Sequence, residues 1–185
     1  MLNHSVPADG DPKDFQPIRL KQRITRSAAL SMADTIKESV KTRKVAILAA
    51  DGVDEATVAS LQRTLTAAGA VPKIVAPRGG TLKGVGGGDV AVDWSLLTVG
   101  SVLFDAVFVP GSAKSTEALG ADGAAVLFVR EAYKHCKAVG GNGTGLAMLR
   151  AAGIDDAIST VPAFLQAIAQ HRDWTREERA RRIPV

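Results

Sequence analysis

The sequence has few of the residues that mark disulfide-rich or metal-binding proteins. Its 185 residues include a single cysteine, Cys136, so an internal disulfide is impossible and this residue alone cannot form a zinc site. The three histidines, His4, His135 and His171, are too scattered to indicate a metal site. Aromatic residues make up 4% of the chain, so we expect a mainly aliphatic core. We expect no metal and no cofactor in this chain, and the lone thiol fits a reducing compartment.

Long apolar runs are also missing. No run reaches the roughly 18 residues that a membrane helix needs. The first residues, Met1–His4, lack the apolar segment of a secretory signal. We therefore expect no membrane partner, and a cytoplasmic location is favoured.

The net charge of +4 is concentrated at the two ends of the chain. Residues 1–44 and 172–185 carry 14 of the 23 Lys and Arg residues but 8 of the 19 Asp and Glu residues. The central part is therefore slightly acidic. Nucleic-acid-binding domains gather basic residues on a folded surface among stacking aromatics, and that pattern is absent here. We expect solvated basic tails and no nucleic-acid partner.

Strand and helix patterns alternate from Lys44 onward. Residues 1–43 have no period and are predicted to be an N-terminal arm or linker, with a possible short helix over Ser27–Val40. Residues 44–185 are predicted to form the folded domain. Nearly continuous apolar runs, typical of strands buried on both faces, occur at 44–50, 71–76, 105–110 and 137–141. Helical patterns occupy 54–68, 115–119, 124–135, 144–152 and 162–171, and the Gly-rich stretch 79–93 indicates a hairpin. The alternation predicts an α/β fold, a doubly wound parallel sheet with helices on both faces.

Doubly wound sheets bind ligands beyond the carboxyl ends of their strands. The turn Gly141–Thr144 follows the last predicted strand and resembles a nucleophile elbow, with Asn142 or Gly143 at its apex. An amide is not a nucleophile, and glycine has no side chain. Thr144 has a hydroxyl but no neighbouring base, so a helix cap is the favoured interpretation. Cys136 precedes its strand and should lie at the opposite edge of the sheet.

Residues 44–58 and 105–112, followed by a helix and this glycine elbow, resemble the class I glutamine amidotransferase-like superfamily, which includes the PfpI-type proteases. Active members place a cysteine at the elbow, followed by histidine and glycine, and use a glutamate after the first strand. The resemblance puts Gly143 in place of the cysteine and Thr144 in place of the histidine. Thr57 stands where the glutamate is expected, unless the alignment slips and leaves Glu55 as the acid.

A closer resemblance is to the C-terminal domain of large-subunit haem catalases. It is carried by Ala29–Met32, Glu131–His135, His171–Trp174 and Arg182–Pro184, which agree with that family in order and spacing. This family implies a flavodoxin-like appendage with a degenerate elbow, attached to a haem-binding core that this chain does not contain. Tyr133, the only tyrosine, does not lie in the family's haem-ligand motif.

The resemblance implies a non-catalytic accessory domain whose partners are the catalase core and the neighbouring subunits of a homotetramer. It also implies chaperone-like binding of unfolded proteins. Haem would belong to the parent core and not to this chain. Two alternatives remain: a PfpI-type hydrolase or deglycase with a rearranged site that uses Cys136 or Glu55, and a small-anion binding module that uses the N–H groups of the elbow.

Overall fold

The computed structural model describes Ser27, Leu30, Ser31 and residues 38–183. The chain divides into two units, Met1–Asp34 and Thr35–Val185, and each is described by itself. In the first unit, the amide N–H groups of Leu30 and Ser31 both donate to the carbonyl of Ser27, which forms a single turn.

The possible helix over Ser27–Val40 lies mostly outside the described residues. Its predicted end is wrong, because residues 38–40 are not helical. The amide of Lys41 donates to the Ser39 hydroxyl, and Thr42 adopts a positive φ of 65°. The chain turns at these residues and then enters the first strand of the sheet at Lys44, so no helix reaches the sheet.

The second unit is built on one parallel sheet of five strands in the order β5-β2-β1-β6-β7. The strands are β1 (Lys44–Leu48), β2 (Val71–Ala76), β5 (Trp94–Ser95), β6 (Ala106–Val109) and β7 (Ala138–Gly141). Ile47 of β1 lies opposite Ile74 of β2 and Phe108 of β6. Every residue of β6 and β7 is buried, as expected for strands covered on both faces.

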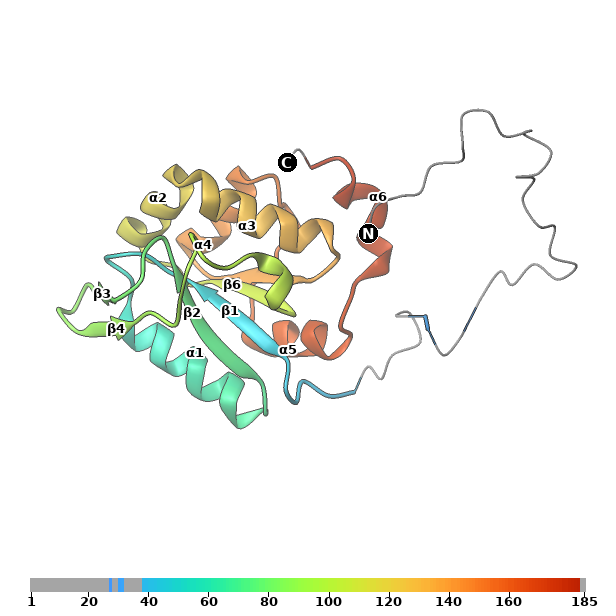
Figure 1. The fold of residues 1–185 in the computed structure, drawn as a ribbon, viewed down its shortest axis with the longest axis horizontal. Coiled ribbons are helices and arrows are strands. Elements are labelled where there is room, and N and C mark those ends of the chain that lie inside the picture. Colours follow the sequence, from blue (N-terminus) through green and yellow to red (C-terminus); the bar gives the residue numbers. More distant parts are fainter. Residues whose placement is uncertain (1–26, 28–29, 32–37, 184–185) are drawn as a thin grey trace, which may run out of the picture. The chain divides into compact units, whose positions relative to one another are not determined.

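Helices cover both faces of this sheet, which confirms the predicted doubly wound α/β fold (Figure 1). Helices α2, α3 and α4 lie over one face, and α1 and α5 lie over the other. Their bounds are α1 (Glu55–Ala67), α2 (Ala113–Ala121), α3 (Gly123–Lys134), α4 (Thr144–Ala151), α5 (Val161–Ala169) and α6 (Glu177–Ala180). None of the helices that the structure describes is long and apolar enough to cross a membrane.

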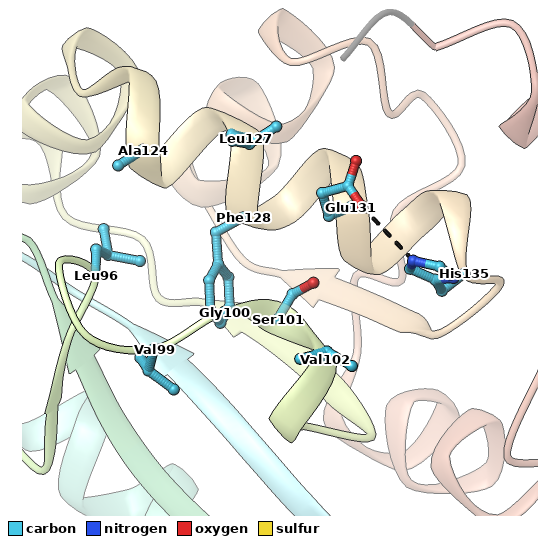
Figure 2. A pocket seen from close by; sticks show the side chains of 10 residues that line it. All are labelled: Leu96, Val99, Gly100, Ser101, Val102, Ala124, Leu127, Phe128, Glu131 and His135. Atoms are coloured by element: carbon cyan, nitrogen blue, oxygen red, sulfur yellow. Dashed lines mark ion pairs between the residues drawn. The ribbon is translucent and has the colours of Figure 1, made fainter. Parts of the chain in front are cut away.

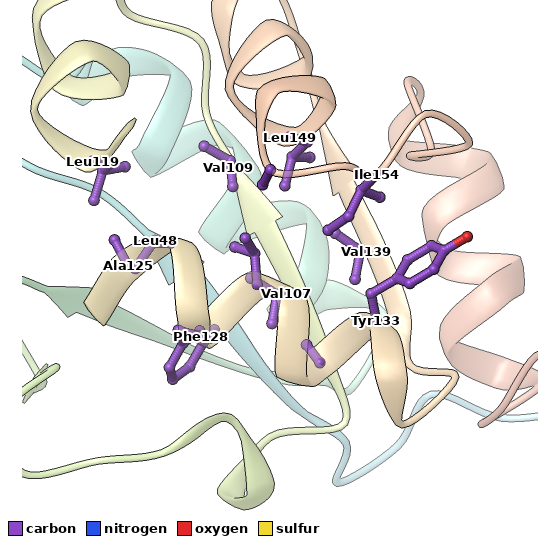
Figure 3. Packing of buried hydrophobic residues seen from close by; sticks show 14 of the residues in the cluster. Leu48, Val107, Val109, Leu119, Ala125, Phe128, Tyr133, Val139, Leu149 and Ile154 are labelled. Carbon is purple, nitrogen blue, oxygen red and sulfur yellow. The ribbon is translucent and has the colours of Figure 1, made fainter. Parts of the chain in front are cut away.

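The two faces of the sheet bury separate aliphatic clusters because successive strand residues point to opposite sides. Val107 and Val109 of β6 pack with Leu119, Phe128 and Leu149 beneath α2, α3 and α4 (Figure 3). The residue between the two valines, Phe108, points to the other face, where its ring lies 5.1 Å from that of Phe164 of α5.

The Gly-rich stretch forms the predicted hairpin, in which β3 (Thr81–Lys83) pairs antiparallel with β4 (Asp89–Ala91). Four short elements have no counterpart in the sequence prediction. They are the edge strand β5, the 3-10 helices η3 (Ser101–Leu103) and η4 (Trp174–Arg176), and helix α6.

Candidate functional site

The turn between β7 and α4 has the backbone geometry of a nucleophile elbow. Gly143 adopts φ 49° and ψ −126°, a conformation that residues with a side chain rarely enter, and it is the N-cap residue of α4. No side chain caps this helix end. Gly143 therefore lies at the apex, and the apex offers an open backbone and no reactive group.

Neighbouring glycines fix this turn against the end of β6. A Cβ atom on Gly145 would overlap the carbonyl oxygen of Val109, and one on Gly111 would overlap the carbonyl oxygen of Asn142. The side-chain Oδ1 of Asn142 accepts a hydrogen bond from the backbone N–H of Gly111 at 2.6 Å. Asn142 thus joins the elbow to the turn after β6, and its role here is structural.

Glu55, one candidate for the missing acid, is held by the hairpin. Its carboxylate accepts hydrogen bonds from the N–H groups of Gly86 and Gly88, at 3.2 and 3.1 Å. Hydrogen bonds from its own backbone N–H and from these two glycines lower the pKa of the Glu55 carboxyl. A Cβ atom on Gly84 or Gly86 would overlap the carboxylate. The glycines of the hairpin tip therefore wrap around one anion, a relation that the sequence spacing does not reveal.

Thr57, the other candidate for that position, belongs to the N-terminal cap of α1. Its hydroxyl donates to Oδ2 of Asp54 at 2.6 Å, and Oδ1 of Asp54 accepts from the N–H groups of Ala56 and Thr57. The hydrogen bond from the Thr57 hydroxyl, followed by those from the two amides, lowers the pKa of Asp54. This carboxylate is committed to the start of α1.

Thr57 and Asn142 do line one shared hollow, with a cavity volume of about 490 Å³. Phe108, Leu61 and the α5 side chains Val161, Pro162 and Leu165 supply its apolar walls. No charged residue and no histidine or cysteine lines it, and Glu55 is not part of its wall. The hydroxyls of Thr57, Ser60 and Thr64 also line the hollow, but none of its described lining residues is an acid or a base that could activate a hydroxyl.

Cys136 lies just before β7, whereas the elbow follows that strand. Its side chain is buried, and burial raises the pKa of its thiol, which disfavours the reactive thiolate. His135 is exposed and lies with Nε2 3.6 Å from a carboxylate oxygen of Glu131. The adjacent cysteine and histidine therefore belong to different environments, which gives a rearranged Cys136 site no support.

Tyr133 also lacks the features of a haem ligand. Its ring is buried in the cluster beneath α3, and burial raises its pKa to about 12. The guanidinium of Arg176 lies 4.7 Å from the ring centroid. A tyrosinate ligand would have to be both ionised and accessible, so these residues do not fit haem. Among the described residues, no group of three or more His, Cys, Asp or Glu side chains could hold a metal ion.

Comparisons with known proteins connect this geometry to two groups. Residues 41–177 match the family model described as the C-terminal domain found in long catalases. The chain is 40% identical over 175 residues to catalase HPII of Mycobacterium avium, covering 81% of this chain and 25% of that protein. It is 37% identical over 168 residues to catalase HPII of Pseudomonas aeruginosa, covering 86% of this chain and 24% of that protein. The chain thus spans about a quarter of the length of these curated relatives.

Among solved structures, a DJ-1 superfamily protein from Salmonella typhimurium aligns with a TM-score of 0.58 and 25% identity. The alignment covers 61% of this chain and 62% of that one. It agrees with the flavodoxin-like arrangement of the sheet and with the resemblance to the PfpI-type superfamily.

Proposed function

The chain belongs to the family of C-terminal domains found in long catalases, and from this premise we propose that it is a non-catalytic accessory domain. Its role is to stabilise a haem catalase core and the assembly of that core with neighbouring subunits into a homotetramer. The observation that carries the proposal is the elbow itself, where Gly143 holds the apex conformation without a nucleophile.

The surroundings of the elbow support the same conclusion. The two residues considered for the position of the acid, Glu55 and Thr57, are held by the hairpin and by the cap of α1. Apolar and hydroxyl side chains line the hollow beside Asn142, and none of its described lining residues is ionisable. An acyl-transfer or hydrolase mechanism needs a nucleophile, a base and stabilisation of an oxyanion. Only the last of these, the N–H groups at the start of α4, has a counterpart here.

A chimeric catalase tests the stabilising role. The matched C-terminal quarter of Mycobacterium avium catalase HPII is replaced by the complete 185-residue chain, and the half-life of catalase activity is measured at elevated temperature. We expect the chimera to stay active longer than the same core truncated before that quarter. The unmodified relative serves as the positive control. A chimera that loses activity and tetrameric assembly as fast as the truncated core contradicts the proposal.

A chaperone-like role is a second candidate, favoured by exposed apolar side chains such as Leu97 and Val102, which are 84% and 76% exposed. The isolated chain is then expected to suppress aggregation of a heat-stressed client protein at near-stoichiometric ratios. Suppression no greater than that by an inert protein of similar size removes this candidate.

A further inference from the structure

The segment Trp94–Phe104 buries Val99, Ser101 and Phe104 but leaves several other apolar side chains exposed. These eleven residues contain no charged side chain. Nine large apolar side chains are exposed among the described residues, and four of them, Trp94, Leu97, Val102 and Leu103, lie in this segment. Exposed apolar area gathered in one place marks a binding surface more often than scattered residues do.

Helix α3 extends this surface across a shallow hollow of about 370 Å³ (Figure 2). Leu96, Val99 and Val102 line it from the segment, and Leu127 and Phe128 line it from α3. Figure 2 shows Phe128 pointing from the helix toward the segment, with the Glu131–His135 pair at one end. We call residues 94–104 together with Leu127 the apolar patch.

The apolar patch is anchored at the place where the chain enters the sheet. Asp105, which follows the patch directly, accepts hydrogen bonds from the backbone N–H of Lys44 at 2.9 Å and from the guanidinium of Arg43 at 3.3 Å. The buried ammonium of Lys137 donates to the carbonyl of Ser101 at 2.6 Å. Residues preceding Lys44 therefore enter the domain at the Asp105 end of the patch. A tether raises the effective concentration of an attached body near its point of entry.

We propose that the apolar patch is the surface on which this domain docks against the catalase core that precedes it in long catalases. The inference rests on the proposed function. Three observations select this occupant: the tether enters at the Asp105 end of the patch, the curated relatives are about four times as long as this chain, and the patch is almost uncharged. A nearly uncharged apolar surface fits the desolvated centre of a protein interface and does not fit a polyanion.

The test introduces charges on the patch in the chimera described above. The double variant Leu97→Asp/Val102→Asp changes two side chains that are 84% and 76% exposed, so the isolated chain should keep its thermal unfolding midpoint within a few degrees. The matched control is Val85→Asp, an exposed valine in the loop of the β3–β4 hairpin. We expect the double variant to shorten the half-life of chimeric catalase activity about tenfold, since removing a buried interface anchor typically costs a factor of ten or more. The control should leave the half-life unchanged.

Hydrogen exchange gives a second measurement that needs no variant. The amides of residues 94–104 should exchange at least about tenfold more slowly in the chimera than in the isolated chain, because an interface excludes water from them. The proposed docking surface is wrong if the double variant preserves catalase activity as long as the wild-type chimera does and the amides exchange equally fast in the chimera and the isolated chain. In that case the stabilised wild-type chimera still supports the proposed function. A wild-type chimera without any stabilisation overturns both. A second copy of this chain is the occupant under two combined results. Sedimentation must show that the isolated chain forms dimers and that the double variant is monomeric, and hydrogen exchange at the patch must be equally slow in the dimer and in the chimera.

Discussion

Replacing Lys137 with methionine should remove a pH dependence of stability between about pH 8 and pH 10.5. The Lys137 side chain is 2% exposed, and its ammonium donates to the carbonyl of Ser101. Burial, reinforced by the charge of Arg172, lowers the pKa of this lysine from 10.5 to about 8. The folded state therefore releases the proton at a lower pH than the unfolded chain does.

The sign and size of the effect follow from this difference in proton binding. Below pH 8 the lysine is charged in both states, and the folded state bears the full cost of burying the charge. As the pH rises toward 10.5, the folded state holds a neutral amine while the unfolded chain stays protonated, so the free energy of unfolding increases. The difference between 10.5 and about 8 corresponds to about 3 kcal/mol over this range.

Lys137→Met keeps the buried stem and removes the titrating group. Urea unfolding of both proteins at several values between pH 7.5 and pH 10.5 gives the difference in unfolding free energy at each pH. We expect the free energy of unfolding of wild type to rise by about 3 kcal/mol relative to that of the variant between pH 7.5 and pH 10.5. Cys136 and Tyr133, whose raised pKa values act in the opposite direction, are present in both proteins and cancel in the difference.

The offset between the two proteins at pH 7.5 has a separate origin. Methionine removes the hydrogen bond from Lys137 to the carbonyl of Ser101, which still accepts one from the N–H of Phe104. The loss of this one bond costs about 1 kcal/mol. Methionine also removes the cost of burying the ammonium. Lys134→Met, which replaces a half-buried lysine at the end of α3, is measured in parallel as the control for the loss of one lysine. A difference between wild type and Lys137→Met that stays flat from pH 7.5 to pH 10.5 would refute the reasoning.

Three further predictions concern the elbow and the hairpin. Gly145→Ala should destabilise the fold by about 3 kcal/mol, because its Cβ would overlap the backbone of Val109. Gly123→Ala, which has open space at its Cβ, should instead stabilise the fold by about 0.5–1 kcal/mol. Chemical unfolding that ranks the two variants in the reverse order contradicts the packing argument. Glu55→Gln should speed hydrogen exchange at the amides of Gly86 and Gly88. In wild type, the same loss of these hydrogen bonds should appear only as the pH falls through the lowered pKa of Glu55. Unchanged exchange in the variant would show that the carboxylate does not order the loop. Gly143→Cys should lower the free energy of unfolding by about 1–3 kcal/mol, because a cysteine must adopt the positive φ of Gly143. The new thiol should react with a disulfide reagent faster than the buried Cys136 does, yet the variant should show no hydrolase turnover. Measurable turnover would mean that a base is present.

The main strands and helices were predictable because their signals are local. The strand Val71–Ala76 matches its prediction at both ends, and the other long elements start or end within two residues of their predicted limits. The edge strand β5 was missed because two residues, Trp94 and Ser95, are too few to show a period, and they pair with β2 only through tertiary contact. Helix α6 and the two 3-10 helices are similarly short.

The candidate site was predictable in composition but not in arrangement. The absence of a cysteine at Asn142–Thr144 is plain from the sequence, and the family that the sequence resembles is confirmed by the match over residues 41–177. The partners of Glu55 were not predictable, because Gly86 and Gly88 lie more than thirty residues away and come beside it only through the hairpin. The apolar patch was missed for a related reason, since a run such as 94–104 gives the same pattern whether it is buried or exposed.

The elbow's shape and its chemistry have separate causes in this domain. Gly145 and Gly111 are required by close backbone contacts with β6 and with Asn142, and these contacts hold the turn whether or not a reactive side chain stands at its apex. Gly143 adopts its positive φ within this turn. The presence of an elbow is therefore no sign of catalysis in this fold, because the sheet needs the turn to place α4 against β6. The apex is a glycine, beside an amide engaged with Gly111 and a hollow lined by hydroxyl and apolar side chains.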